Sequence, residues 1–257
     1  MVMQVMKKEL RFHSCGFSYD PVDSMVRSQW QPKSKNTFYF FYRWVVAAIF
    51  VAMVIISLYS HLQEFSFDLF FIYLTHWGII LNMIVGIYGT ALVSIWYFHT
   101  EYREMPPSFK IYWALHNVTL ATSYVNFVSI AAKTRISLSS IMNHALNSVI
   151  MFIDFLIVAY PMSLYHAIQP MCFGACFAVF SYIYYSCGGV NEFGDPFIYT
   201  LLNWEKPENA LTTVVAVSIL VILVHMILFY IYKLRVFTQL RLFETELVMP
   251  TTTIELN

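Results

Sequence analysis

Apolar stretches of about 20 residues recur along this 257-residue sequence and constrain its fold more than any other feature. A helix of that length spans the hydrocarbon core of a bilayer, where the backbone must satisfy its own hydrogen bonds. Charged residues make up only 12% of the chain, against about 25% in an average soluble domain. The sequence therefore predicts an all-α fold, a polytopic transmembrane helical bundle.

Six spans can be delimited in the sequence. The third is the least hydrophobic, so a five-span arrangement is the alternative. The expected organisation is an N-terminal arm over residues 1–37, a bundle over 38–234 and a C-terminal tail over 235–257. The predicted spans cover residues 38–59, 70–97, 111–132, 139–160, 166–186 and 211–234.

The placement of the basic residues predicts how the bundle is oriented. If the N-terminus is cytosolic and six spans follow, all of the 15 basic residues except Lys133, Arg135 and Lys206 fall on inner segments. Cytoplasmic segments of membrane proteins carry an excess of Lys and Arg. Both termini are therefore expected in the cytosol. Acidic residues also number 15, so net charge gives no indication of a nucleic-acid partner.

The longest external loop, residues 187–210, has the composition of a compact cap. Gly188-Gly189 and Gly194-Asp195-Pro196 are turn sequences within it. Its aromatic residues form either a surface for an extracellular protein partner or an aromatic belt at the membrane interface. These residues are Phe193, Phe197, Tyr199 and Trp204.

The cysteines indicate no disulfide framework. Cys172 and Cys176 are four residues apart on a predicted helix, a spacing that favours small buried thiols over a redox pair. The sequence also lacks the motifs of zinc proteases, nucleotide-binding loops and zinc clusters. No cofactor or metal is therefore expected.

Three neighbouring spans carry polar or small residues at helical spacing. Helices in lipid associate through small residues and interhelical hydrogen bonds, so these faces are expected to meet inside the bundle as structural contacts. The stripes are Thr75, Gly78, Asn82, Gly86 and Gly89; His116, Thr119, Ser123 and Asn126; and Ser140, His144, Asn147, Met151 and Asp154.

Asp154 is the most costly residue in these stripes because it is predicted near the middle of a span. An unpaired charge there is expensive. Asp154 must therefore be protonated, paired with a group such as His225, or exposed to a wet cavity, and either a structural or a functional role is open. Transport is one functional hypothesis that rests on these two residues.

Thr75 and His144 form a candidate catalytic pair. Both follow the outer start of their spans by about five residues, which places them about 8 Å deep in the same leaflet. The imidazole can act as a base toward the hydroxyl. Asn143, Asn147 or His76 would orient the imidazole or polarise a carbonyl. His116 is predicted in the opposite leaflet, as a packed or interfacial residue.

The sequence from Gly188 to Ala210 resembles the signature loop of the rolling stone family of insects, through Phe197-Ile198-Tyr199 and residues 202–207. Ser28-Gln29-Trp30-Gln31 and Asn143-His144 are similar to the same family, and the resemblance covers roughly residues 15–235. It implies a multi-pass protein of the plasma membrane, with the endoplasmic reticulum as the alternative, that acts in cell–cell interaction or myoblast fusion. Its expected partners are membrane lipids and a protein bound through the loop; the sequence does not specify the oligomeric state.

A more distant resemblance is to the androgen-induced family of six-span membrane proteins, which hydrolyse fatty acid esters of hydroxy fatty acids. The family's threonine lies in a Leu-Thr-aromatic setting, and Leu74-Thr75-His76-Trp77 is similar, with His76 inserted. Its histidine follows an asparagine, as in Asn143-His144. The resemblance implies an intramembrane lipid-ester hydrolase with Thr75 as nucleophile and His144 as base. From the polar stripes, the supporting polar residues of this candidate site are Asn82, Asn143, Asn147 and Asp154.

Overall fold

The structure, a computed structural model, describes residues 22–31, 35–99, 106–130 and 141–248, and this part of the chain is almost entirely helical. Each of the six predicted spans corresponds to a helical region, and short helical turns occur between them. The longer elements are α2 (Thr37–Leu62), α4 (Leu74–His99), α5 (Pro107–Ile130), η3 with α7 (Ile141–Leu146 and Asn147–Ile157), α8 (Ile168–Ser186) and α9 (Pro207–Val248). The short turns are η2 (Val22–Val26), α3 (Phe67–Phe70), η4 (Leu164–Ala167) and η5 (Thr200–Leu202).

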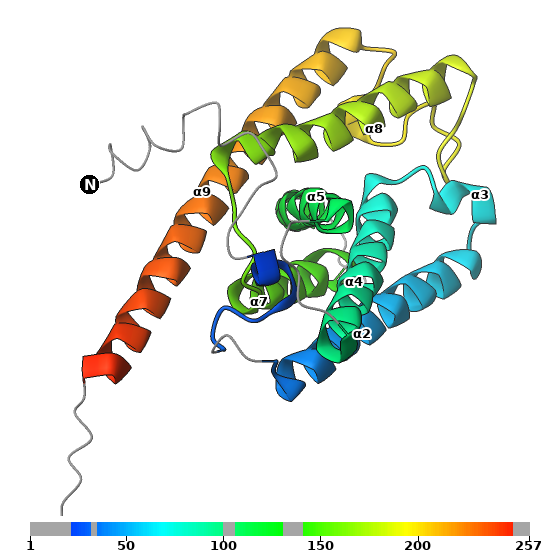
Figure 1. The fold of residues 1–257 in the computed structure, drawn as a ribbon. Coiled ribbons are helices and arrows are strands. Elements are labelled where there is room, and N and C mark those ends of the chain that lie inside the picture. Colours follow the sequence, from blue (N-terminus) through cyan, green and yellow to red (C-terminus); the bar gives the residue numbers. More distant parts are fainter. Residues whose placement is uncertain (1–21, 32–34, 100–105, 131–140, 249–257) are drawn as a thin grey trace, which may run out of the picture.

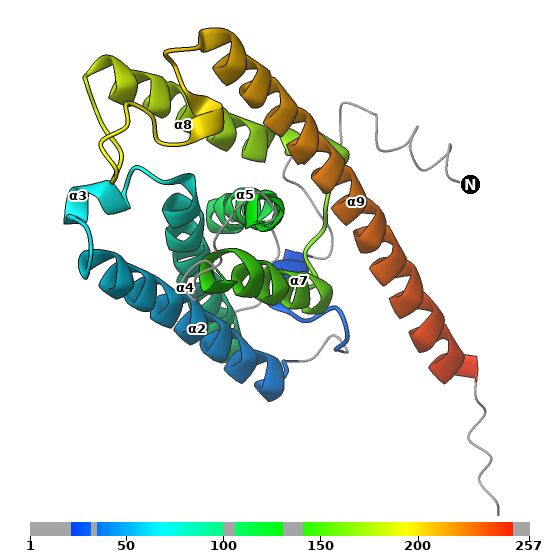
Figure 2. The same cartoon turned by 180° about the vertical axis from the view of Figure 1, so that it is seen from behind.

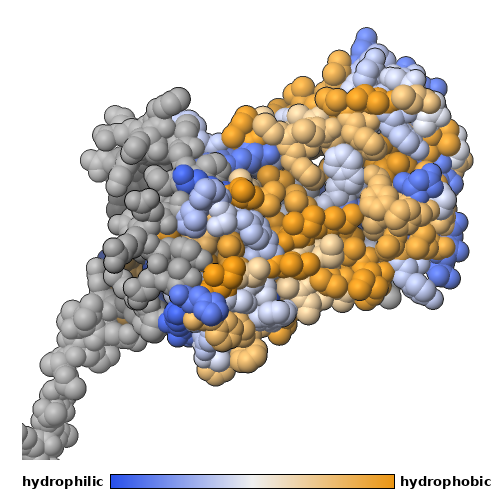
Figure 3. All heavy atoms as spheres, turned by 45° about the vertical axis from the view of Figure 1, so that its right-hand side comes forward, coloured by the Kyte–Doolittle hydropathy of each residue, from blue (hydrophilic) through white to orange (hydrophobic). Residues whose placement is uncertain are grey.

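Four helices in the described part are long and apolar enough to cross a membrane: α2, α4, α9 and α8 together with η4. Only 17% of the apolar window of α8 is buried within the protein, and 22% of that of α9. Figure 3 shows hydrophobic side chains over most of one face, with hydrophilic residues gathered toward its edges. Because the described residues leave these apolar surfaces largely uncovered, lipid is the solvent that suits them.

The outer surface of α8 also corrects an expectation from the sequence. Cys172 and Cys176, which were predicted to be buried, are both exposed on this helix. The spacing of four residues correctly put them on one helical face. The spacing alone did not show that this face of α8 points away from the bundle.

Helix α5 explains why the third predicted span is the least hydrophobic. It lies at the centre of the helices and packs against α4, α7, α8 and α9 (Figures 1 and 2). Side chains enclosed by protein can be polar if they are hydrogen-bonded, and α5 buries His116, Asn117, Thr119 and Ser123. The helix begins at Pro107, a residue suited to a first helical position because it lacks the N–H that would be unpaired there.

The fourth helical region ends earlier than predicted, at Ile157 rather than 160. Residues 158–163 are not helical, and the N-terminal arm pairs with the start of this segment. The Gln29 N–H donates to the Ile157 carbonyl at 2.7 Å, and the Trp30 indole N–H donates to the Leu156 carbonyl at 2.8 Å. These contacts satisfy carbonyls that the end of a helix leaves unpaired. Part of the arm therefore belongs to the bundle.

Helix α9 extends beyond the predicted sixth span, so residues 235–248 of the expected tail are helical. No Gly or Pro occurs between Ala210 and Pro250 to end it. A helix rises about 1.5 Å per residue, so its 42 residues extend about 60 Å, roughly twice the hydrocarbon core. Arg235 is buried and donates to the main-chain carbonyls of Phe155 and Tyr160, which anchors the extension to the bundle.

Candidate functional site

The three polar stripes meet in the interior, as predicted. The Asn82 side-chain amide donates to Ser123 Oγ at 3.0 Å and to Asn147 Oδ1 at 2.6 Å. Asn147 in turn donates to Ser123 Oγ at 3.3 Å. All three residues are buried, and they join α4, α5 and α7 by hydrogen bonds within one layer. Ser140, the first residue of the third stripe, lies outside the described residues.

Asp154 is paired, but its partner is Arg43. The Arg43 Nη1 lies 2.7 Å from Asp154 Oδ1, and both side chains are almost fully buried. The Tyr42 hydroxyl donates to the same oxygen at 2.9 Å, and His116 Nε2 lies 3.4 Å from Asp154 Oδ2. Arg43 had been counted with the inner cytosolic charges. Instead, the second turn of α2 carries it into the bundle, where it neutralises the carboxylate.

The predicted pairing of Asp154 with His225 is wrong. His225 Nε2 donates to the main-chain carbonyl of Ser163 at 2.8 Å. That carbonyl, in the non-helical segment after α7, also accepts the His166 backbone N–H at 3.2 Å, so His225 supplies a second hydrogen bond to it. The transport hypothesis, which rested on Asp154 and His225, receives no support from this arrangement.

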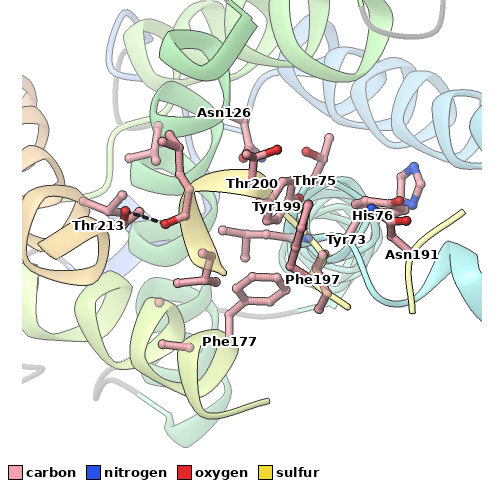
Figure 4. Close-up of a pocket in the computed structure, with 18 of the residues that line it drawn as sticks. Tyr73, Thr75, His76, Asn126, Phe177, Asn191, Phe197, Tyr199, Thr200 and Thr213 are labelled. Carbon is pink, nitrogen blue, oxygen red and sulfur yellow. Dashed lines mark hydrogen bonds between the residues drawn. The ribbon is translucent and has the colours of Figure 1, made fainter. Parts of the chain in front are cut away.

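Thr75 and His144 line one cavity of about 900 Å³. Figure 4 shows Thr75 among the residues that line it. Its walls come from the end of α2, the start of α4, the end of α5, η3, α8, the first turns of α9 and the loop between them. Thr75 is the second residue of α4, and His144 lies in the single π-helical turn of η3. The fold thus places both residues of the candidate pair at one end of the bundle.

Tyr199 connects the loop to the candidate nucleophile. Its hydroxyl accepts a hydrogen bond from the Leu74 N–H at 3.0 Å and also interacts with Thr75. Burial raises the pKa of the Tyr199 hydroxyl to about 12, so the phenol is neutral at physiological pH. From the sequence, Tyr199 was expected either on a surface for a protein partner or in an aromatic belt at the membrane interface. The structure instead packs it beneath the loop, beside Thr75.

The His144 ring is held by the backbone of α5. Its Nδ1 donates to the Asn126 main-chain carbonyl at 2.8 Å, which fixes a proton on Nδ1 and leaves the lone pair of the neutral ring on Nε2. That tautomer suits a general base. Two predicted helpers have other contacts: Asn143 donates to Ser57 Oγ at 2.8 Å, and His76 stacks on Phe70 at 3.9 Å between ring centroids.

Residues 187–206 form the compact cap that the turn sequences predicted. Asn191 Oδ1 accepts from the N–H groups of Phe193 and Asp195, both at 2.9 Å, and Gly194 adopts a φ of 84° in the turn. The Trp204 indole donates to Ser181 Oγ on α8 at 3.0 Å. Of the four aromatic residues expected either on a partner surface or in an aromatic belt, Phe193 is 76% exposed, whereas Tyr199 and Trp204 pack against a hydrophobic cluster.

No group of three or more His, Cys, Asp or Glu side chains within the described ranges is arranged to hold a metal ion.

Comparison with known proteins identifies the family. The family model described as protein rolling stone matches residues 2–248. The chain is 34% identical over 247 residues to protein rolling stone of Drosophila melanogaster, with 89% of each chain covered. No solved structure matches. The apolar helices and this similarity together indicate an integral membrane protein, and the chain belongs to the rolling stone family.

Proposed function

We propose that the chain crosses the plasma membrane six times, with both termini in the cytosol. The alternation of helix ends around the cavity supports this topology, because α2 and α5 end there whereas α4 and η3 begin there. The enclosure of α5 by other helices accounts for its low hydropathy and favours the six-span arrangement over the five-span alternative. In this orientation the cap and Cys187 face the extracellular side.

The function proposed from the family resemblance is a role in cell–cell interaction or fusion, including myoblast fusion, through the extracellular cap. The observation that carries it is Phe193, which is 76% exposed on a cap held rigid by its own hydrogen bonds. Large exposed aromatic side chains are common anchors in protein interfaces. A rigid cap would bring this anchor to a partner at low entropic cost.

Cells that express the protein can test both the proposed topology and the proposed role of the cap. A membrane-impermeant maleimide should label Cys187, which is exposed, on intact cells. The same cells, mixed with partner cells, should adhere or fuse more than cells that express Phe193→Ser. Phe67→Ser is the matched control, because Phe67 is 56% exposed on α3, outside the cap. Cys187 that is labelled only after permeabilisation would contradict the topology, and equal mixing with Phe193→Ser would contradict the role of the cap.

A second candidate function is hydrolysis of fatty acid esters of hydroxy fatty acids. The specific observation in its favour is that Thr75 and His144 line the same cavity. In the proposed reaction, Thr75 Oγ attacks the ester carbonyl while His144 Nε2 takes its proton. The proton then passes to the leaving hydroxyl oxygen of the hydroxy fatty acid. Water, deprotonated by His144, then attacks the acyl-threonine. The acyl–Oγ bond breaks, His144 returns the proton to Thr75 Oγ, and the fatty acid is released.

Thr75→Ala and His144→Ala should each reduce fatty acid release by purified protein by about 100-fold or more, the usual range for loss of a nucleophile or general base. Thr200→Ala is the matched control because Thr200 lines the same cavity on η5. Turnover that is equal in the wild type and in both variants would exclude the reaction.

A further inference from the structure

The cavity has one apolar wall and one polar end. Helices α8 and α9 contribute Phe177, Val217 and Val221 to the apolar side. The opposite side contributes Ser57 from the end of α2, Thr75 from the start of α4 and His144 from η3. A volume of about 900 Å³ is at the upper end of the range for small-molecule sites. Such a cavity suits an amphiphile with an acyl chain and a small polar group.

Gly174 gives the apolar wall its open shape. The residues of α8 that line the cavity include Pro170, Met171, Phe177 and Ala178, and Gly174 lies at the centre of this face, three and four residues from each. A Cβ built on Gly174 would meet nothing within 4 Å. Glycine lowers helix stability by about 1 kcal/mol relative to alanine. Here the missing side chain leaves space inside the cavity.

The charged residues that line the cavity disfavour an anionic amphiphile. Among the described residues that line it are the carboxylates Glu64, Glu192 and Asp195, and these residues include neither Lys nor Arg. An anionic head group placed near these carboxylates would be repelled without a compensating cation. An uncharged polar group would instead find hydroxyl, imidazole and amide partners.

We propose that this cavity binds an uncharged lipid ester and discriminates against the corresponding free carboxylic acid. The inference deepens the proposed ester hydrolysis, because it specifies the ligand class of the same cavity, but binding does not require turnover. It also predicts that a hydroxy-fatty-acid ester binds better as its methyl ester than as its free acid. The ester group would lie toward Thr75 and His144, and the acyl chain along α8 and α9.

The test uses full-length Thr75→Ala protein in nanodiscs at pH 8.5, so that binding is scored whether or not the wild type hydrolyses esters. The two probes are a diazirine-bearing palmitic acid and its methyl ester, and the readout is saturable photo-labelling of cavity peptides. The methyl ester should compete for the labelled site at concentrations at least about tenfold lower than those at which the free acid competes. Equal competition by the two compounds would overturn the proposal, even if hydrolysis had been demonstrated.

A cavity-filling variant locates the site. Gly174→Phe should reduce labelling by the methyl ester at least about tenfold, because the ring would occupy the space of the ligand. Cys176→Phe, on the exposed face of the same helix, is the matched control and should label normally. Unchanged labelling of Gly174→Phe would place the lipid elsewhere and contradict the proposal. The comparison of ester with acid needs no cavity variant, so a misfolded Gly174→Phe would leave that result decisive.

Discussion

Arg43→Ala is expected to destabilise the protein by about 3–5 kcal/mol, the range for removing one partner of a buried ion pair. Arg43 is 1% exposed, and its Nη1 lies 2.7 Å from Asp154 Oδ1. Its removal would leave the buried Asp154 carboxylate without its guanidinium partner, beside the Tyr42 hydroxyl and His116. Unfolding of the purified protein in mixed micelles, followed by circular dichroism, measures the loss.

A double variant separates loss of the pair from loss of packing. Arg43→Met with Asp154→Leu should recover most of the stability, because neither charge then remains without its partner. Asp23 and Arg27 provide a control pair at 3.5 Å with greater exposure, where Arg27→Ala should cost at most about 1 kcal/mol. If Arg43→Ala and Arg27→Ala have similar effects, Arg43 and Asp154 do not form the buried pair described here.

Gly89→Ala should destabilise the same region by about 1–3 kcal/mol through overpacking. A Cβ at this position would lie 2.5 Å from Arg43 Nη2 and 2.6 Å from the Tyr112 hydroxyl. Because Arg43 also donates to Tyr112 at 3.1 Å, moving either side chain would strain the bonds that hold Asp154. The shift in thermal unfolding temperature, measured in the same micelles, provides the test.

Gly174→Ala is the matched control, and the opposite sign is expected. A Cβ at Gly174 meets nothing within 4 Å, so the substitution should stabilise the protein by about 0.5–1 kcal/mol through helix propensity. Two glycine-to-alanine changes in membrane helices would thus differ in sign. Stabilisation by Gly89→Ala would show that the chain does not pack as closely around Arg43 as described.

The positions of the helices could be predicted because hydropathy is a local property. The first predicted span, 38–59, agrees with α2 (Thr37–Leu62) within three residues at each end. The polar stripes were also predictable, because residues three and four apart share a helical face and polar faces avoid lipid. The hydrogen bonds among Asn82, Ser123 and Asn147 follow from that pattern.

The candidate site could be predicted only in part. Alternation of the spans placed Thr75 and His144 at one end, and both line the cavity there. Tyr199 was missed because the loop offered several aromatic residues and no periodicity to show which of them turns inward. The contact of His144 with the Asn126 carbonyl was missed because it depends on how η3 packs against α5.

The sequence by itself determined the membrane class, the helical regions and the faces that meet, because each follows from solvent preference and from residues within two helical turns. The tertiary structure decided which groups satisfy one another. Arg43 and Asp154 are 111 residues apart, and whether Arg43 or His225 neutralises the carboxylate depends on how α2 and α9 pack beside α7. That choice depends on the relative positions of whole helices, which no local pattern specifies.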